Sequence, residues 1–266
     1  MKTLLLVSVL VLSSISFTQD TVLRHCNFAL KEVPQSRASC FAYVVPQDDS
    51  TFWVQQYRRD SSQYLEATFE DAALKIKKGK CYYYYDNDSL RSFGNFVDNE
   101  KEGLWKFYWE DGKANQEGTY KVGKPHGEWL YYRADGSLSS REQYEVGERL
   151  SSEWYDESGK AFTPKETDEY DPVFPGGEAA LMRYIAENVK YPEISMEMAE
   201  QGTVYIQFVV EEDGELTSFK VIRGVSDALD KEALRVMKSM PKWKPGFLHN
   251  RKQKVRFTLP VTFSLR

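Results

Sequence analysis

Residues 103–112 read GLWKFYWEDG, and residues 127–136, which lie 24 positions further on, read GEWLYYRADG. Both stretches share the pattern Gly-x-Trp-x-x-Tyr-x-x-Asp-Gly. The same offset relates Gly94 to Gly118 and Phe96 to Tyr120, and weaker copies precede this region from residue 79 and follow it to about residue 160. Similarity at one fixed period indicates a repeated structural unit, so the first half of the chain is predicted to use one element several times.

Each repeat is predicted to be a β-hairpin. Residues 104–109 are rich in aromatic residues, which favour strands, and Asp111-Gly112 suits a tight turn because glycine tolerates a positive φ. A single hairpin cannot bury two aromatic faces, whereas stacked hairpins can. We therefore expect an all-β domain of stacked hairpins over residues 20–160, with the clearest repeats in residues 79–160.

The shared pattern resembles the MORN-type repeat of the bacterial variant family. The resemblance covers roughly residues 79–160 and implies an elongated, curved β-sheet that binds a partner or a surface and performs no catalysis. Two interpretations of Trp105 and Trp129 stay open at this point: the rings form the core of the stack, or they form an aromatic recognition surface.

Composition limits the classes of function. The chain has 266 residues, of which 41% are hydrophobic and 28% charged, which fits one or two folded domains. The formal net charge of −5 argues against a protein that binds the nucleic-acid backbone, because such proteins need a basic face. We expect no nucleic-acid partner.

The N-terminus resembles an export signal. Lys2 precedes an apolar run over residues 4–12 and a small polar run over residues 13–16, which together are typical of a secretory signal peptide. We expect residues 1–18 to be removed and the mature chain to lie in the periplasm. The alternative is that the segment is retained and anchors the chain in the inner membrane.

Three cysteines follow the signal. In an oxidising compartment Cys26 and Cys40 could form a disulfide; the alternative is that both are small buried hydrophobic residues. Cys81 occupies the repeat position of Trp105 and Trp129 and is expected in the core. The cysteines and histidines lack the spacing of a zinc site, so no metal and no cofactor are expected.

The pattern changes after residue 160. Pro164, Pro172 and Pro175 bracket an acidic stretch without apolar periodicity, and residues 161–175 are predicted to be a linker. Residues 176–266 then follow an α+β pattern of two helices and three strands. The helices are expected over residues 178–189 and from Ser226 or Asp227 to Pro241, and the strands over residues 203–211, 216–223 and 255–265.

This second pattern resembles the C-terminal domain of TonB, the energy-transducing protein of Gram-negative bacteria. The opening Phe-Pro-Gly-Gly at residues 174–177 is similar to the version common in Bacteroidota, and the resemblance covers residues 172–266. It implies two helices on a three-stranded antiparallel sheet. The residues that carry the family motif are Tyr191, Pro192, Gly202, Trp243 and Pro245.

The resemblance implies that the domain binds the Ton box, a short extended segment of outer-membrane receptors, by pairing it with a sheet edge. The last strand fits this role independently, because Pro260 cannot donate a ladder hydrogen bond and therefore favours an edge strand or a bulge. The residues expected at the binding edge are Lys254, Val255, Arg256, Phe257, Thr258, Leu259, Pro260, Val261, Thr262 and Phe263.

Departures from the family limit what the resemblance implies. A full transducer keeps its N-terminal membrane helix, which contacts ExbB–ExbD, and has a long proline-rich spacer. Here a signal peptide and a repeat domain stand instead, so contact with ExbB–ExbD is expected only if the N-terminal segment is retained. The chain could also pair with a second copy as a homodimer.

No catalytic residues are expected. The sequence has no glycine-rich phosphate loop, no nucleophile elbow and no supported Ser/His/Asp set, so the chain is predicted not to be an enzyme. The sequence predicts a periplasmic TonB-like adaptor that pairs with extended segments of TonB-dependent outer-membrane receptors or other envelope proteins and contributes to TonB-linked transport. The alternative is a structural scaffold of the envelope whose MORN-like repeats bind the partner.

Overall fold

The computed structural model describes residues 21–265 and divides the chain into two compact units, one ending at Ser151 and the other beginning at Ser152. The predicted signal peptide, residues 1–18, lies outside the described residues. Among those described, no helix combines the length and the hydropathy needed to cross a membrane.

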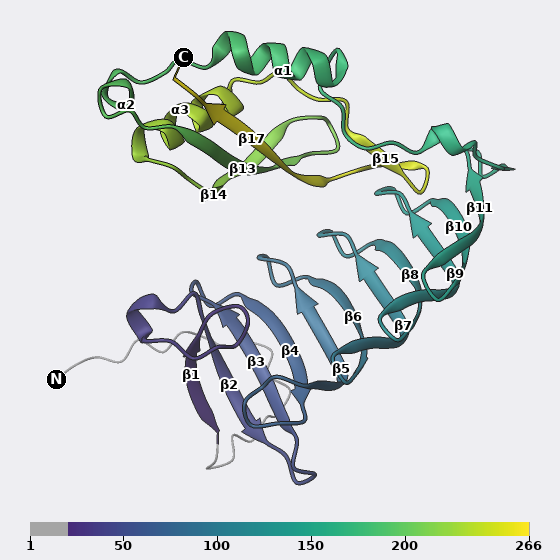
Figure 1. Cartoon of the computed structure of the whole chain (residues 1–266). Coiled ribbons are helices and arrows are strands. Elements are labelled where there is room, and N and C mark those ends of the chain that lie inside the picture. The colour runs from purple at the N-terminus through teal and green to yellow at the C-terminus, as the bar shows by residue number, and fades with distance from the viewer. Residues whose placement is uncertain (1–20, 266) are drawn as a thin grey trace. The chain divides into compact units, whose positions relative to one another are not determined.

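Twelve strands form one antiparallel sheet in which the order in space is the order in the chain (Figure 1). The expected stacked hairpins are therefore confirmed, and the sheet begins earlier than the clear repeats do. The strands are β1 Val22–Cys26, β2 Cys40–Pro46, β3 Phe52–Arg58, β4 Gln63–Phe69, β5 Lys77–Tyr84, β6 Leu90–Val97, β7 Glu100–Tyr108, β8 Ala114–Lys121, β9 Lys124–Tyr132, β10 Leu138–Glu145, β11 Glu148–Tyr155 and β12 Ala161–Phe162.

The Gly-x-Trp part of the repeat builds the core of the first unit. Gly103 has a positive φ of 70° at an irregularity in the β6–β7 pairing, and two residues later Trp105 lies flat over Gly94. The indole nitrogen of Trp105 donates a hydrogen bond to the carbonyl of Asn95 at 3.1 Å. Trp129 repeats this arrangement over Gly118. Both rings are fully buried, so they are core and not a recognition surface.

The Asp-Gly part of the repeat closes the hairpins. Gly112 has a φ of 85°, and its N–H donates to the carbonyl of Trp109 at 2.9 Å. The carboxylate of Asp111 accepts a hydrogen bond from the backbone N–H of Lys113 at 3.1 Å. Asp135 does the same for the next hairpin, which shows why aspartate precedes glycine in both copies.

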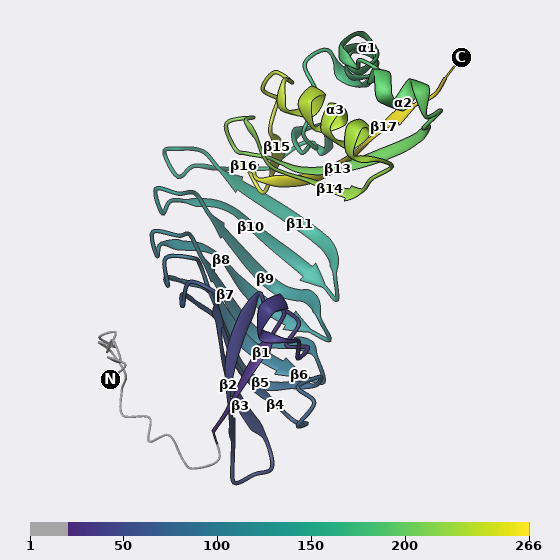
Figure 2. The same ribbon diagram turned by 90° about the vertical axis from the view of Figure 1, so that its left-hand side faces the viewer.

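The second unit contains a three-stranded antiparallel sheet of order β14-β13-β17 with two main helices (Figure 2). This confirms the predicted fold class. Ser226 is the N-cap of α3, and its hydroxyl accepts a hydrogen bond from the N–H of Leu229. The elements are α1 Gly177–Asn188, α2 Glu193–Glu197, β13 Gly202–Val210, β14 Leu216–Arg223, α3 Asp227–Lys238, β15 Gly246–Leu248, β16 Arg251–Gln253 and β17 Val255–Phe263.

The short helix α2 and the β15–β16 hairpin were not expected from the sequence. Both are too short to produce a recognisable hydrophobic period, because α2 has five residues and β15 and β16 have three each.

Residues 161–175, expected as a linker, carry more structure than that expectation suggests. They contain β12, the 3-10 turn η2 Glu166–Asp168, and two isolated bridges that join Tyr170 to Phe247 and Val173 to Lys244. The ring of Phe174 lies in the core of the second unit. Each of these structured pieces is only one to three residues long, so none of them leaves a periodic pattern in the sequence. The domain bounds at residues 160 and 176 stay a prediction.

Candidate functional site

The last strand, β17, is an edge strand of the sheet in the second unit. It pairs with β13 along its whole length in one register, from Gly202 opposite Phe263 to Val210 opposite Val255. Among residues 21–265, no strand pairs with its other side. An unpaired edge presents backbone N–H and C=O groups to which another extended chain can be added.

Side chains alternate along β17 as the sequence predicts. The odd positions, such as Val261 and Phe263, point into the core, whereas Arg256, Thr258 and Thr262 are exposed. One face of the strand is therefore fixed by packing, and the other face can be changed without disturbing the core.

Pro260 defines which backbone groups face outward. It pairs with Tyr205 without any break in the register, although it has no N–H. A proline inside a regular edge strand places its nitrogen on the open side. Because the direction of the N–H repeats every two residues, the N–H groups of Arg256, Thr258 and Thr262 point to the open side, and that of Phe257 points to β13.

Trp243, one of the family-motif residues, packs against the core-facing side of the edge strand β17. Its buried indole packs against Phe208 and Phe257, with ring centroids 5.6 and 5.7 Å apart. Its backbone N–H donates to the carbonyl of Gly214 in the hairpin turn at 2.9 Å. A Cβ at Gly214 would stand 2.0 Å from the carbonyl oxygen of Trp243, so this turn requires glycine.

The remaining family-motif residues hold loops and not the open edge. The ring of Tyr191 meets that of Phe263 at 5.7 Å, and its hydroxyl donates to the carbonyl of Glu200. Pro192 is the N-cap of α2. A Cβ at Gly202 would stand 2.9 Å from a methyl group of Val225. Pro245, half-buried, directly precedes β15.

The basic residues around β17 are partly neutralised. Lys254 forms an ion pair with Glu211 at 2.9 Å, and Lys242 forms one with Asp213. The ammonium of Lys244 lies 3.6 Å from the ring centroid of Tyr170. Among the described residues of this cluster, Lys244, Lys252 and Arg256 are exposed cations with no carboxylate within ion-pair distance. The ion pairs of Lys242 and Lys254 therefore reduce the positive charge near the edge only in part.

The sheet has a second edge, β14, which the sequence did not single out. Its pairing with β13 is interrupted twice, near Ile206 and near Val209. Ser218, in the middle of β14, has a φ of 55°. Irregular pairing bends and twists an edge and makes it a poor template for a further strand. The regular edge at β17 is the better candidate.

The predicted cysteine pair lies in the first unit, on β1 and β2. Cys26 is directly opposite Cys40, and their sulfur atoms are 3.4 Å apart without a bond between them. Burial, together with the neighbouring Cys40, raises the pKa of the Cys26 thiol to about 12. The amide nitrogen of Gln56 donates to Cys40 Sγ at 3.0 Å. The disulfide stays a prediction, and Cys81 is buried in the core as expected.

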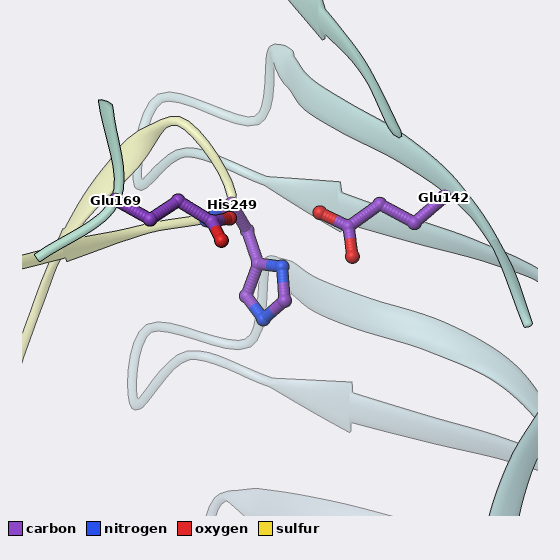
Figure 3. Close-up of side chains that lie close together, drawn as sticks. All are labelled: Glu142, Glu169 and His249. Atoms are coloured by element: carbon purple, nitrogen blue, oxygen red, sulfur yellow. The ribbon is translucent and has the colours of Figure 1, made fainter. Parts of the chain in front are cut away.

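Three further titratable side chains, those of Glu142, Glu169 and His249, are drawn in Figure 3, and both carboxylates accept hydrogen bonds within their own units. In the first unit the buried carboxylate of Glu142 accepts hydrogen bonds from the hydroxyls of Ser140 and Tyr144, at 3.1 and 2.6 Å. In the second unit the backbone N–H of His249 donates to Glu169 at 3.4 Å. These bonds give each carboxylate a structural role.

Residues 187–265, which include β17 and Trp243, match the family model described as the C-terminal part of the Gram-negative bacterial TonB protein. Over these residues the second unit is similar to a TonB C-terminal domain. Two solution structures of the Helicobacter pylori TonB C-terminal domain are similar to it. One is 24% identical over 32% of this chain and 90% of its own, with a TM-score of 0.27; the other is 27% identical over 35% and 87%, with a TM-score of 0.28. The assignment rests on the family match.

No curated protein matches the chain. The matched residues support a TonB-like protein that interacts with protein partners. The hairpin repeats lie outside the matched residues and have a separate fold.

Proposed function

We propose that this chain is a periplasmic TonB-like adaptor whose β17 edge binds an extended segment of a TonB-dependent outer-membrane receptor or of another envelope protein, and that it thereby contributes to TonB-linked transport. The observation that carries the proposal is the uninterrupted β13–β17 register with an open outer side. The predicted binding residues are those from Lys254 to Phe263.

Backbone pairing would supply most of the affinity. Arg256, Thr258 and Thr262 offer N–H donors on the open side, and the carbonyls of these residues and of Pro260 offer acceptors. A net contribution of about 1 kcal/mol for each bond gives reversible binding. Pro260 leaves one gap in the row of donors, which favours a partner with a missing acceptor or a bulge at that point.

The test compares two substitutions at one position. Thr258→Pro removes an outward N–H on the exposed face, and Thr258→Ala keeps that N–H. Titration of the full-length protein with N-terminal peptides of outer-membrane receptors, followed by amide chemical shifts, should show shifts along residues 254–263 that Thr258→Pro abolishes and Thr258→Ala retains. Phe257→Pro should disturb the fold itself, because that N–H points to β13.

Equal binding by the wild type and by Thr258→Pro would contradict strand addition at β17. Shifts confined to residues 79–160, with residues 254–263 silent for every peptide, would favour the alternative in which the hairpin repeats bind the partner.

Coupling to an energy source is a separate question with its own test. Contact with ExbB–ExbD needs a membrane anchor, and the sequence offers residues 1–19 for this role. Determination of the mature N-terminus by mass spectrometry decides the matter: a retained segment favours transduction, and a cleaved one favours a soluble adaptor.

A further inference from the structure

The sheet of the first unit has a hollow on the face that carries Trp105 and Trp129. The hollow has a volume of about 490 Å³ and lies over β5 to β8, which run side by side in Figure 2. Its aromatic lining includes Tyr83, Trp105 and Phe107. The proposal for β17 does not use this site.

Irregular pairing supplies the polar lining. In the β5–β6 pair, Tyr83 is opposite Ser92 and Tyr84 is opposite Leu90, so Arg91 is an extra residue between them. The β7–β8 pair repeats the irregularity and leaves Asn115 between its paired neighbours. An extra residue in one strand re-aims a side chain. Arg91 and Asn115 both line the hollow.

Two cations face this hollow. The ammonium of Lys101 lies 4.5 Å from the ring centroid of Trp105 and 4.7 Å from that of Tyr120. The guanidinium of Arg91 lies 5.4 Å from the ring centroid of Tyr83. Burial lowers the pKa of Lys101; the neighbouring Cys81 opposes this shift, and the positive charge of Arg91 adds to it. Two like charges thus share one partly buried site.

No carboxylate within residues 21–265 forms an ion pair with Lys101 or Arg91, and this distinguishes them from neighbouring basic residues. Lys106, on the opposite face of β7, pairs with Glu117 at 2.8 Å, and Arg58 pairs with Asp86 at 2.9 Å. Ring faces attract the two cations but leave their net charge in place. The hollow is therefore complementary to an anion, in a protein whose net charge is −5.

We propose that this hollow binds an acidic saccharide, that is, a sugar ring that carries a carboxylate. Arg91 and Lys101 would bind the carboxylate by charge-assisted hydrogen bonds. The partly exposed rings of Tyr83 and Phe107 would pack against the apolar face of the sugar, and the fully buried Trp105 would not contact it. Asn115, Gln116 and Ser92, which line the same hollow, add polar groups suited to sugar hydroxyls. A bare inorganic anion would use the charges but not the rings.

The test is calorimetric titration of the full-length protein with D-glucuronate, and with D-glucose and sodium phosphate as separate titrants at constant ionic strength. We expect saturable binding of D-glucuronate and at least tenfold weaker binding of the other two. Lys101→Met and Arg91→Met keep much of the apolar stem and should each weaken D-glucuronate binding about tenfold. Lys106→Met, on the opposite face, is the matched control and should bind as the wild type does.

Thermal unfolding of each variant checks that the fold is intact. The proposal is overturned if D-glucose binds as tightly as D-glucuronate, because the cations would then have no role. It is also overturned if phosphate binds as tightly, if D-glucuronate shows no saturable binding, or if Lys106→Met weakens binding as much as Lys101→Met does.

Discussion

At the scale of single residues, the repeat is explained by pairs of positions that change together. A Trp lies over Gly94 and over Gly118, where a Cβ would stand 2.2 Å from the indole. In the earlier copy Cys81 takes the place of the Trp, and the residue opposite it is Ala67. The position under a large Trp ring is therefore glycine, and the position opposite the smaller Cys81 side chain is alanine.

Gly118→Ala is expected to destabilise the first unit by about 1–3 kcal/mol, because the added methyl group overlaps the ring of Trp129. The cost should fall when the substitution is made in a Trp129→Cys background, which reproduces the Ala67–Cys81 pair. Urea unfolding of the four proteins of this double-mutant cycle measures the coupling. An equal cost in both backgrounds would mean that the ring is not the cause.

Cys26 and Cys40 are expected to form a disulfide in an oxidising compartment, since the two sulfur atoms lie 3.4 Å apart on opposite residues of paired strands. The loop-entropy estimate gives about 3 kcal/mol of stabilisation. Labelling of the denatured, unreduced protein should find one thiol, that of Cys81, and none in a Cys81→Ser control. Three labelled thiols in the wild type would refute the bridge.

At the scale of elements, the hairpins from β3 to β10 contribute buried rings to the core of the sheet, namely Phe69, Phe96, Trp105 and Trp129. Trp105 contacts Phe96, Phe107 and Tyr120 with ring centroids 5.2 to 6.1 Å apart, so it joins three strands. Such a stack depends on its neighbours for burial, which is the physical basis of cooperativity in repeat proteins.

Trp105→Ala should therefore cost about 3–5 kcal/mol of the free energy of unfolding of the first unit. The matched control is Leu104→Ala in the same strand. That side chain is 54% exposed, and its loss should change stability by no more than about 0.5 kcal/mol. Chemical denaturation followed by circular dichroism compares the two, and similar costs would show that the ring does not support the stack.

At the scale of the whole molecule, the turn aspartates make stability depend on pH. The pKa values of Asp111 and Asp135 are lowered, chiefly by hydrogen bonds from the backbone N–H groups of Lys113 and Ser137. Asp213, in the second unit, is lowered by Lys242. Because the folded state holds these protons less tightly than the unfolded state does, the stabilisation is present above the unfolded pKa, near 4.

The urea midpoint should therefore change little between pH 7 and pH 5 and fall as the pH drops below about 4 through the lowered pKa values. Asp135→Asn removes one of the titrating groups, and its midpoint should fall less steeply with acid than that of the wild type. A midpoint that stays constant to pH 3 would contradict the role of these carboxylates.

The sequence alone determined the features that depend on local order. The 24-residue period, the Asp-Gly turns, the alternation along residues 255–263 and the two long helices all follow from neighbouring residues, and so does the family resemblance over residues 172–266. Only the tertiary structure decided that β13 is central and that β17 and β14 are the two edges, because strand order depends on contacts between distant segments. It also decided that Arg91 and Lys101 face one hollow, because an extra residue in a strand changes side-chain direction without leaving a periodic signal.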